Sequence, residues 1–282
     1  MKAIVTTEWL AGEIGARDLR VVDVRWYLDP QRIGRAAYRA GHIPGAVFLD
    51  VGADLSAPGG VRGSPLGRHP WPSEEQVSRA IGGAGIGQET RVVAYDDQAG
   101  AIAARLWYLL RAFGHDAVSV LDGGIAKWQA EGRALEVGDI VAPPARFVAR
   151  GREGWVVGKD EMKGLDPSTL VIDARAGERY RGETEPIDPR AGHIPGAVNV
   201  PFAGNLTEGA VPVFRSADEL RTRFAEVGAD RSLPIVYCGS GVTACHDLLA
   251  LHVAGLRGRL YGGSWSEWSA DPALPIATGG KP

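Results

Sequence analysis

The chain has 282 residues, enough for about two domains, and its 45% hydrophobic content is too high for a disordered protein. Its 31 basic and 34 acidic residues give a net charge of −3, which leaves no basic surface for nucleic acid or anionic lipid. No apolar stretch approaches the length of a membrane span and the N-terminus lacks a signal-peptide pattern, so we expect no membrane association and a cytoplasmic location. Two cysteines are too few for a disulfide scaffold or a four-ligand zinc site, and we expect neither metal nor organic cofactor.

Short apolar runs alternate with helical patterns in the first half of the chain. The runs at residues 19–24, 91–95 and 118–121 are typical of buried parallel strands. Residues 101–113 have the length and composition of a helix, which Gly114 ends. Ser73, followed by Gln76, has the pattern of a capping box that begins an earlier helix.

The second half of the chain repeats this order of elements. Strands are predicted at residues 170–174, 233–237 and 259–261, and a helix at residues 242–254, which Gly255 ends. Ser216 and Glu219 form the corresponding capping box. Strands that alternate with helices predict an α/β fold, with mostly parallel sheets that carry helices on both faces.

The order recurs because the chain is a tandem duplication. The motif Gly-His-Ile-Pro-Gly-Ala-Val at residues 41–47 returns at residues 192–198, an offset of 192 − 41 = 151. The strand end around Asp23 returns around Asp173, an offset of 173 − 23 = 150, and a Gly-Gly pair with a following Trp closes each copy. A period of this length indicates two whole domains rather than a solenoid. We predict domains at residues 1–135 and 147–282, joined by a linker at residues 136–146.

Comparison of the two copies separates structural from chemical candidates. A residue present in both copies is expected to serve the fold, and a residue of one copy alone is a better candidate for chemistry. His42 and His193 hold the same place in their motifs, so we predict structural roles for both. Local ion pairs or loop hydrogen bonds are predicted for Asp23 with Arg25 and for Asp173 with Arg175.

Cys238 is the largest difference between the copies. It follows a predicted strand of the second copy at the place where Asp96 stands in the first, and a glycine-rich loop then leads directly into a helix. Such a loop directs several backbone N–H groups to one point, and with the helix dipole it favours a thiolate. The alternative is a small buried residue at a strand end. Cys245 is expected to be buried within the helix, although a disulfide with Cys238 stays open if their Cα atoms are close.

Together these features resemble the two-domain rhodanese family of sulfurtransferases. The resemblance covers nearly the whole chain: both Gly-His-Ile-Pro-Gly-Ala motifs, Asp96 in place of a first cysteine, the Gly-Gly and Trp endings, and the loop Cys-Gly-Ser-Gly-Val-Thr at residues 238–243. It implies two tandem rhodanese-like domains, only the second of which is catalytic, and transfer of sulfur through a persulfide on Cys238. The loop is similar to that of members that use 3-mercaptopyruvate, whereas members that use thiosulfate carry Arg and Lys after the cysteine.

The resemblance also implies substrate-binding residues. Arg179, whose offset in the first copy is held by Asp29, matches the arginine that binds the substrate carboxylate. Arg190 is the candidate for a second arginine, although Arg39 holds the matching place in the first copy. The predicted substrate-binding set is Arg179, Arg190, Gly239, Gly241, Val242 and Thr243.

A proton relay is implied as well. Ser240 and His69 match the serine and histidine that assist proton transfer, and with Cys238 they form the predicted catalytic set. Because His69 comes from the first copy, the resemblance places the active site between the domains. Gly52 occupies the position of the relay aspartate, which leaves Asp50 or Asp54 as a substitute or the relay incomplete.

Four hypotheses of function follow. The first is transfer from 3-mercaptopyruvate, the second transfer from thiosulfate, and the third a persulfide carrier or binding module with weak turnover. A tyrosine-type phosphatase is disfavoured because it needs Cys-x5-Arg, and Ala244 stands six residues after Cys238. The expected partners are a small-molecule sulfur donor and, as acceptor, cyanide or a thiol such as a thioredoxin-like protein or a low-molecular-weight thiol.

Overall fold

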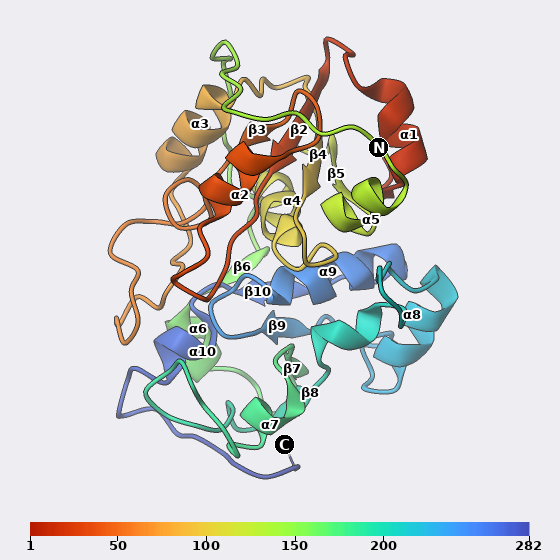
Figure 1. The fold of residues 1–282 in the computed structure, drawn as a ribbon. Coiled ribbons are helices and arrows are strands. Elements are labelled where there is room, and N and C mark those ends of the chain that lie inside the picture. The colour runs from red at the N-terminus through yellow and green to blue at the C-terminus, as the bar shows by residue number, and fades with distance from the viewer. Residues whose placement is uncertain (282) are drawn as a thin grey trace. The chain divides into compact units, whose positions relative to one another are not determined.

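The computed structural model describes residues 1–281, which form two compact units (Figure 1). Unit 1 comprises Met1–Leu55, Pro72–Arg152 and Thr207–Phe214. Unit 2 comprises Ser56–Trp71, Glu153–Leu206 and the described chain from Arg215 onward. Each unit therefore contains one short segment from the other half of the sequence.

Unit 1 is built on a five-stranded parallel sheet. The strand order is β1-β5-β4-β2-β3, and every pairing is parallel, as expected for strands that alternate with helices. The strands are β1 (Ile4–Val5), β2 (Leu19–Asp23), β3 (Val47–Phe48), β4 (Arg91–Tyr95) and β5 (Val118–Leu121). The helices are α1 (Thr7–Glu13), α2 (Gly34–Ala40), α3 (Glu74–Gly83), α4 (Ala103–Ala112) and α5 (Gly124–Ala130).

Apolar side chains bury both faces of this sheet. On one face, Leu10 of α1 and Trp128 of α5 pack with Val21, Val93 and Tyr95 of the central strands. The other face is covered by α4, which contacts β4 and β5 and is buried along almost its whole length. The predicted arrangement of helices on both faces is therefore confirmed for unit 1.

Unit 2 repeats the same architecture. Its parallel sheet has the order β6-β10-β9-β7-β8, which corresponds strand for strand to unit 1. Trp265 and Trp268 pack with Met162 on one face, and α9 contacts β9 and β10 on the other. The strands are β6 (Val156–Val157), β7 (Val171–Asp173), β8 (Ala197–Asn199), β9 (Ile235–Tyr237) and β10 (Arg259–Tyr261). The helices are α6 (Lys159–Lys163), α7 (Gly177–Tyr180), the 3₁₀ helix η1 (Phe202–Asn205), α8 (Ala217–Ala225), α9 (Ala244–Val253) and α10 (Ser264–Trp268).

Residues shared by both copies have structural roles, as the duplication predicts. The Arg25 guanidinium donates to the Asp23 carboxylate and to the Gly41 carbonyl, and Arg175 makes the same contacts with Asp173 and Gly192. Both predicted capping boxes are present, at Ser73 and at Ser216. Each motif histidine bonds a backbone carbonyl through Nδ1, His42 to Tyr38 at 3.0 Å and His193 to Tyr180 at 2.8 Å.

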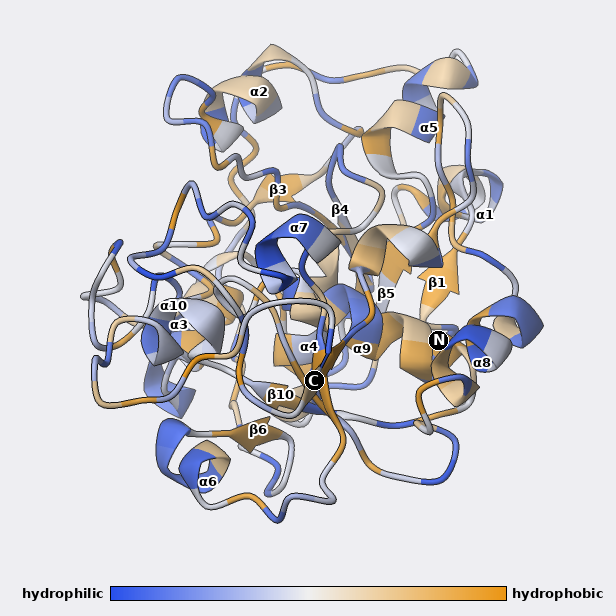
Figure 2. Cartoon of the chain, turned by 90° about the horizontal axis from the view of Figure 1, so that it is seen from below, coloured by the Kyte–Doolittle hydropathy of each residue, from blue (hydrophilic) through white to orange (hydrophobic). Residues whose placement is uncertain are grey.

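Hydrophobic residues concentrate in the strands. In Figure 2 strands such as β1 and β6 are orange, whereas the short surface helices α6 and α7 are largely blue. No helix within residues 1–281 is long and apolar enough to cross a membrane.

The two units exchange segments of chain. Unit 1 takes up Thr207–Phe214, where the Phe214 N–H donates to the Asp122 carboxylate at 2.9 Å. Unit 2 takes up Ser56–Trp71, which precedes α3 in sequence. Residues 136–146, predicted as a linker, lie against unit 1, where the Ala145 N–H donates to the Gly82 carbonyl at 2.9 Å.

Candidate active site

Cys238 directly follows β9, at the carboxyl end of a central parallel strand. Its side chain is buried, at 1% exposure. Its N–H donates to Ser264 Oγ at 3.1 Å, and its carbonyl accepts from the Trp265 N–H at 2.9 Å. Ser264 holds a left-handed backbone conformation, with φ of 53°, in order to make this contact. The start of α10 thus fixes the backbone of Cys238 from both sides.

The loop after Cys238 presents unpaired backbone donors. Gly241 has a φ of 74°, a left-handed turn that favours glycine and directs the chain into α9. The N–H groups of Ser240, Val242 and Thr243 have no hydrogen-bond partner among the residues that the structure describes. Such donors at the N-terminus of a buried helix favour a bound anion. Cys245, a buried free thiol, donates to the Gly241 carbonyl at 3.3 Å and holds this turn in place.

Ser240 and His69 are brought together. The distance from Ser240 Oγ to His69 Nδ1 is 2.9 Å, and both side chains are buried. His69 lies in the segment Ser56–Trp71, so the contact is formed within unit 2. The segment docks on α10 through Gly67, whose φ is 76° and where a Cβ atom would lie 2.9 Å from the Gly263 carbonyl oxygen. The next residue, Arg68, donates its N–H to Ser266 Oγ at 3.1 Å.

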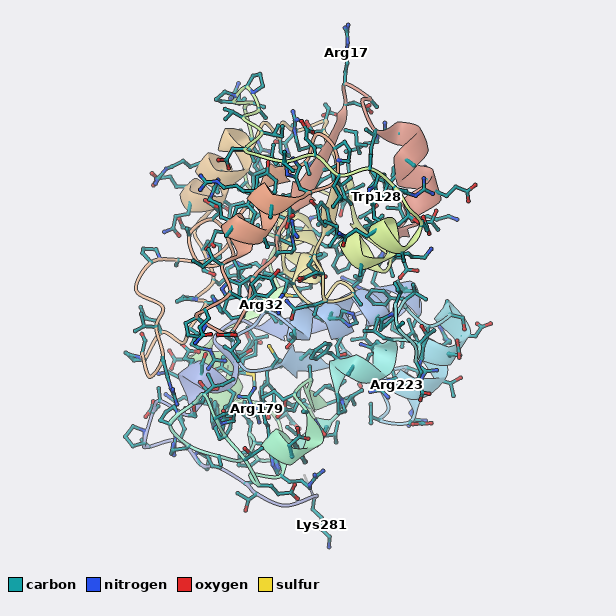
Figure 3. All side chains as sticks on the ribbon, viewed as in Figure 1. Arg17, Arg32, Trp128, Arg179, Arg223 and Lys281 are labelled. Carbon is teal, nitrogen blue, oxygen red and sulfur yellow. The ribbon has the colours of Figure 1, made fainter. Side chains whose placement is uncertain are left out.

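Arg179 lies in α7, and its guanidinium reaches the Cys238 loop (labelled in Figure 3). A Cβ atom placed on Gly239 would lie 3.5 Å from Arg179 Nη1. The opposite edge of the guanidinium is held by two buried carboxylates, Glu185 at 2.7 Å and Asp188 at 3.2 Å. Burial raises the pKa of Asp188 above its ordinary value, and the neighbouring Arg68 opposes that shift.

Arg68 is a site residue that the sequence reasoning missed. Its Nη2 would lie 2.7 Å from a Cβ atom on Gly239, and its Nη1 donates to Asp188 Oδ1. Burial lowers the pKa of Arg68, while the charges of Asp188 and Cys238 oppose the shift. The available signal was its position beside His69 in the sequence, but nothing local indicates that its side chain turns toward Gly239.

Arg190 is not brought to the loop. Its guanidinium donates to carbonyl oxygens that follow α10, among them Ser269 at 2.8 Å and Leu274 at 3.1 Å. With a further contact to the Trp268 carbonyl at the end of α10, they satisfy carbonyl oxygens at and beyond the C-terminus of the helix, as a cap does. The geometry therefore gives Arg190 a structural position, and we leave it out of the site we propose.

The candidate relay aspartates are engaged in their own loop within unit 1. Asp50 accepts the N–H groups of Gly52 and Ala53 at 2.8 and 2.9 Å. Asp54 accepts the N–H of Asp50 at 2.7 Å, and burial raises the pKa of the Asp54 carboxyl. Both carboxylates stabilise the turn that follows β3.

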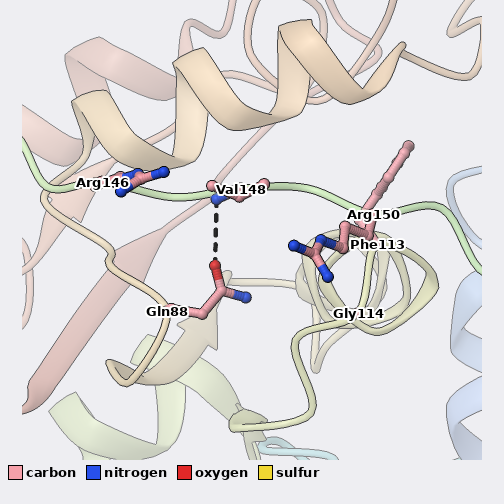
Figure 4. Close-up of a pocket in the computed structure, with 6 residues that line it drawn as sticks. All are labelled: Gln88, Phe113, Gly114, Arg146, Val148 and Arg150. Carbon is pink, nitrogen blue, oxygen red and sulfur yellow. Dashed lines mark hydrogen bonds between the residues drawn. The ribbon is translucent and has the colours of Figure 1, made fainter.

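Other features of the described chain do not add to this chemistry. A pocket of about 500 Å³ in unit 1 (Figure 4) is lined by Gln88, Phe113, Gly114, Arg146, Val148 and Arg150, none of which was predicted as a site residue. Within residues 1–281, no three His, Cys, Asp or Glu side chains are grouped so that they could hold a metal ion. The site as built offers a buried thiol, unpaired backbone donors and two guanidinium groups, which suits nucleophilic attack on an anionic substrate.

The chain is similar to known proteins along nearly its whole length. The rhodanese-like domain family matches residues 6–131 and 159–271. A Pseudomonas aeruginosa protein named "Probable 3-mercaptopyruvate sulfurtransferase" is 43% identical over 98% of both chains. The thiosulfate sulfurtransferase of Rattus norvegicus is 36% identical over 99% of this chain and 96% of its own. The crystal structure of SseA, a 3-mercaptopyruvate sulfotransferase from Escherichia coli, superposes with a TM-score of 0.81 at 34% identity, covering 94% of this chain and 99% of that one.

Proposed function

This chain belongs to the rhodanese family of sulfurtransferases, and on that premise we propose that it moves a sulfur atom from 3-mercaptopyruvate to a thiol or cyanide through a persulfide on Cys238. One observation carries the proposal: Cys238 ends a buried strand beside N–H groups that have no partner in the described chain, whereas Asp96 fills the equivalent place in unit 1. Buried N–H donors without an acceptor are costly, and a persulfide anion would satisfy them.

In the first half-reaction, the Cys238 thiolate attacks the sulfur atom of 3-mercaptopyruvate. The sulfur–sulfur bond forms as the carbon–sulfur bond breaks, and the electron pair of the broken bond leaves with the enolate of pyruvate. Arg179 would hold the substrate carboxylate through its Nη1 edge, since Glu185 and Asp188 occupy the other edge. Orientation of the reacting atoms and the donors around the anion supply the catalysis.

The enolate takes up a proton to become pyruvate. Ser240 Oγ, which lies 2.9 Å from His69 Nδ1, is a hydroxyl of the Cys238 loop and is suited to pass that proton on. The docked segment Ser56–Trp71 positions the histidine. We therefore assign His69 and Ser240 to proton transfer.

In the second half-reaction, the acceptor attacks the outer sulfur of the persulfide. The sulfur–sulfur bond breaks and Cys238 returns to the thiolate, so the cycle needs no external oxidant. A low-molecular-weight thiol, a thioredoxin-like protein thiol and cyanide are all suitable acceptors. Cys238 and Cys245 are both free thiols, which fits the reducing, cytoplasmic setting that we propose.

Mass spectrometry of the protein after reaction with 3-mercaptopyruvate tests the proposal. The peptide that contains Cys238 should gain about 32 Da, one sulfur atom, and the gain should disappear on addition of cyanide or a thiol. Pyruvate should be released in an equal amount. A labelled peptide that lacks Cys238, or pyruvate release without labelling, would contradict the mechanism. Thiosulfate is the second candidate donor, and the ratio of the two kcat/KM values decides between them.

A further inference from the structure

Unit 1 contains a pocket that takes no part in the chemistry proposed above. It has a volume of about 500 Å³, and all the residues that line it belong to unit 1: Gln88, Phe113, Gly114, Arg146, Val148 and Arg150 (Figure 4). Pockets that bind small organic molecules have volumes of about 300 to 1,000 Å³. The pocket is therefore large enough for an organic ligand rather than for an inorganic ion alone.

Residues 145–152 form one wall of this pocket. Burial alternates along the segment, because Phe147 and Ala149 are buried while the even-numbered residues from 146 to 150 line the pocket. An alternation with a period of two is typical of an extended chain. Both arginines of the pocket therefore stand on one face of the segment, on either side of Val148 (Figure 4).

The backbone of this wall is fixed by hydrogen bonds within unit 1. The Arg150 N–H donates to the Phe113 carbonyl oxygen at 3.0 Å, and the Ala149 N–H donates to Ser78 Oγ at 3.0 Å. Gly114, which follows the end of α4, has a φ of 90°, a left-handed conformation that favours glycine. The position of the two arginines along the wall is thus determined by the protein's own backbone.

The two arginines of the pocket have no acidic partner. Neither Arg146 nor Arg150 forms an ion pair or a side-chain hydrogen bond with any residue in positions 1–281, and none of the lining residues is a carboxylate. Arg152, two residues further along, provides the contrast, since its guanidinium donates to both carboxylate oxygens of Asp116 at 2.9 and 2.6 Å. The pocket therefore carries two positive charges that the protein itself does not neutralise.

Gln88 adds a neutral donor to these charges. Its amide oxygen accepts the Val148 N–H at 3.2 Å, so its NH2 group is turned to the side of Arg150 (Figure 4). Phe113 and Val148 contribute apolar carbon atoms to the lining. Two guanidinium groups and an amide N–H suit an anion with three acceptor oxygens, and the apolar residues suit an organic group attached to it.

We propose that this pocket of unit 1 binds a small organic phosphate monoester. Its phosphate group is held by Arg146, Arg150 and the Gln88 amide, and its organic group contacts Phe113 and Val148. A phosphate monoester carries a charge of about −1.5 to −2 at pH 7, which the two arginines match. The inference goes beyond the proposed function, because it uses no residue of the Cys238 loop and gives the copy without the cysteine a ligand of its own.

Calorimetry with phenyl phosphate tests the inference, because this probe joins a phosphate group to an apolar ring. It should bind at least about 5-fold more tightly than inorganic phosphate, which lacks the ring, and than benzoate, which carries one negative charge. Phenol, which is uncharged at pH 7, should bind more weakly still. The inference is wrong if phenol or inorganic phosphate binds as tightly as phenyl phosphate, since the arginines or the apolar residues would then contribute nothing.

Variants of the lining residues show which side chains hold the probe. Arg146→Gln and Arg150→Gln should each weaken the binding of phenyl phosphate about 3- to 10-fold, as expected for charge-assisted contacts that are partly exposed to water. Arg150→Lys should recover part of the loss. Arg79→Gln is the matched control and should bind the probe as the native protein does, since Arg79 is exposed on α3 and pairs with Glu75. Unchanged affinity in both pocket variants would overturn the inference.

Hydrogen exchange measured by mass spectrometry locates the probe and separates this inference from the proposed function. Phenyl phosphate should slow amide exchange in the peptide that contains residues 145–152, whether or not the peptide that contains Cys238 is also protected. Protection of the Cys238 peptide alone, or of neither, would overturn the inference. Arg146→Gln should still form the persulfide on Cys238. If Cys238 is not labelled while residues 145–152 are protected, the proposed function fails and the phosphate site stands.

Discussion

The loops after β4 and β9 hold equivalent places in their sheets and differ in the anion that they serve. After β4, the Asp96 carboxylate accepts the N–H groups of Gln98, Gly100, Ile102 and Ala103 at 2.7 to 2.9 Å. After β9, the N–H groups of Ser240, Val242 and Thr243, in the loop that follows Cys238, have no acceptor within the described residues. Unit 1 therefore satisfies its donor ring with a carboxyl group of its own chain, whereas the ring of unit 2 is left for the anion that the proposed reaction forms on Cys238.

The helices that contact these two loops, α5 in unit 1 and α10 in unit 2, also differ between the units. The Asp96 carbonyl accepts from the Ile125 N–H and the Cys238 carbonyl from the Trp265 N–H, both at 2.9 Å. In unit 1 the residue directly before Ile125 is Gly124, where a Cβ atom would lie 2.2 Å from the Asp96 carbonyl oxygen. In unit 2 it is Ser264, whose hydroxyl accepts the Cys238 N–H. The helix of unit 2 thus adds a hydroxyl contact to the cysteine backbone, whereas the helix of unit 1 has a glycine at the corresponding place.

Replacement of Cys238, the residue that follows β9, should have the largest effect on activity. Cys238→Ala removes the nucleophile, so sulfur transfer from either donor should fall by about 10⁴-fold or more. Cys245→Ala is the matched cysteine control and should keep most of the activity. Steady-state assays with both donors measure the difference, and substantial turnover by Cys238→Ala would contradict the mechanism.

Replacement of Asp96, the residue that follows β4, should lower stability rather than activity. Asp96→Asn offers only one amide oxygen to four N–H groups, and its amide NH2 adds two further donors beside them. The free energy of unfolding should therefore fall by about 3 kcal/mol. Asp97→Asn, next in the chain but partly exposed, should cost about 1 kcal/mol or less. Urea unfolding measures both. If Asp96→Asn protein that is still folded loses turnover, Asp96 has a role in activity and the comparison of the two loops is wrong.

Replacement of Arg179, the proposed substrate-binding arginine, should have the next largest effect on activity. Arg179→Gln should lower kcat/KM for 3-mercaptopyruvate by about 10- to 150-fold, because a charge-assisted contact to the carboxylate is lost. Arg181→Gln is the control, since Arg181 is exposed and pairs with Glu183. Equal rates for the two variants would remove Arg179 from the site.

The smallest expected effect concerns the fourth residue of the helix that follows each loop, and it is a change in how stability depends on pH. The residue is Leu106 in α4 and Asp247 in α9, and burial raises the pKa of Asp247 to about 8. The folded state therefore keeps a proton that the unfolded chain releases above about pH 4, so stability falls as the pH rises from about 4 to 8. Between pH 5 and 6.5 the native protein should lose about 2 kcal/mol of unfolding free energy relative to Asp247→Asn. The exposed Asp230→Asn should keep the native slope, and parallel unfolding curves for native protein and Asp247→Asn would contradict the assignment.

Much of the fold could be predicted from the sequence because its signals are local. The central strands and the capping boxes at Ser73 and Ser216 are confirmed, since apolar runs and N-cap residues act over a few positions. The four-residue helix α7, which carries Arg179, is too short for a periodic pattern.

The site was predicted only in part, because part of it depends on contacts between distant segments. Cys238 and Ser240 stand out since one copy alone carries their loop. Arg68 and Asp188 meet across 120 positions of sequence, and no local pattern indicates such a pairing. The position of Arg190 below α10 likewise depends on residues some 80 positions away.

The exchange of segments between the units determines the order in which the chain can complete its structure during synthesis. Residues 56–71 leave the ribosome long before β9 exists, so Arg68 and His69 wait for most of the second half before they have partners. Unit 1 in turn is complete only after residues 207–214 have been made. A fragment of residues 147–282 would lack the side chains of Arg68 and His69. A fragment of residues 1–135 would lack residues 207–214, which complete unit 1. Division of the gene at its point of duplication would therefore return two incomplete domains.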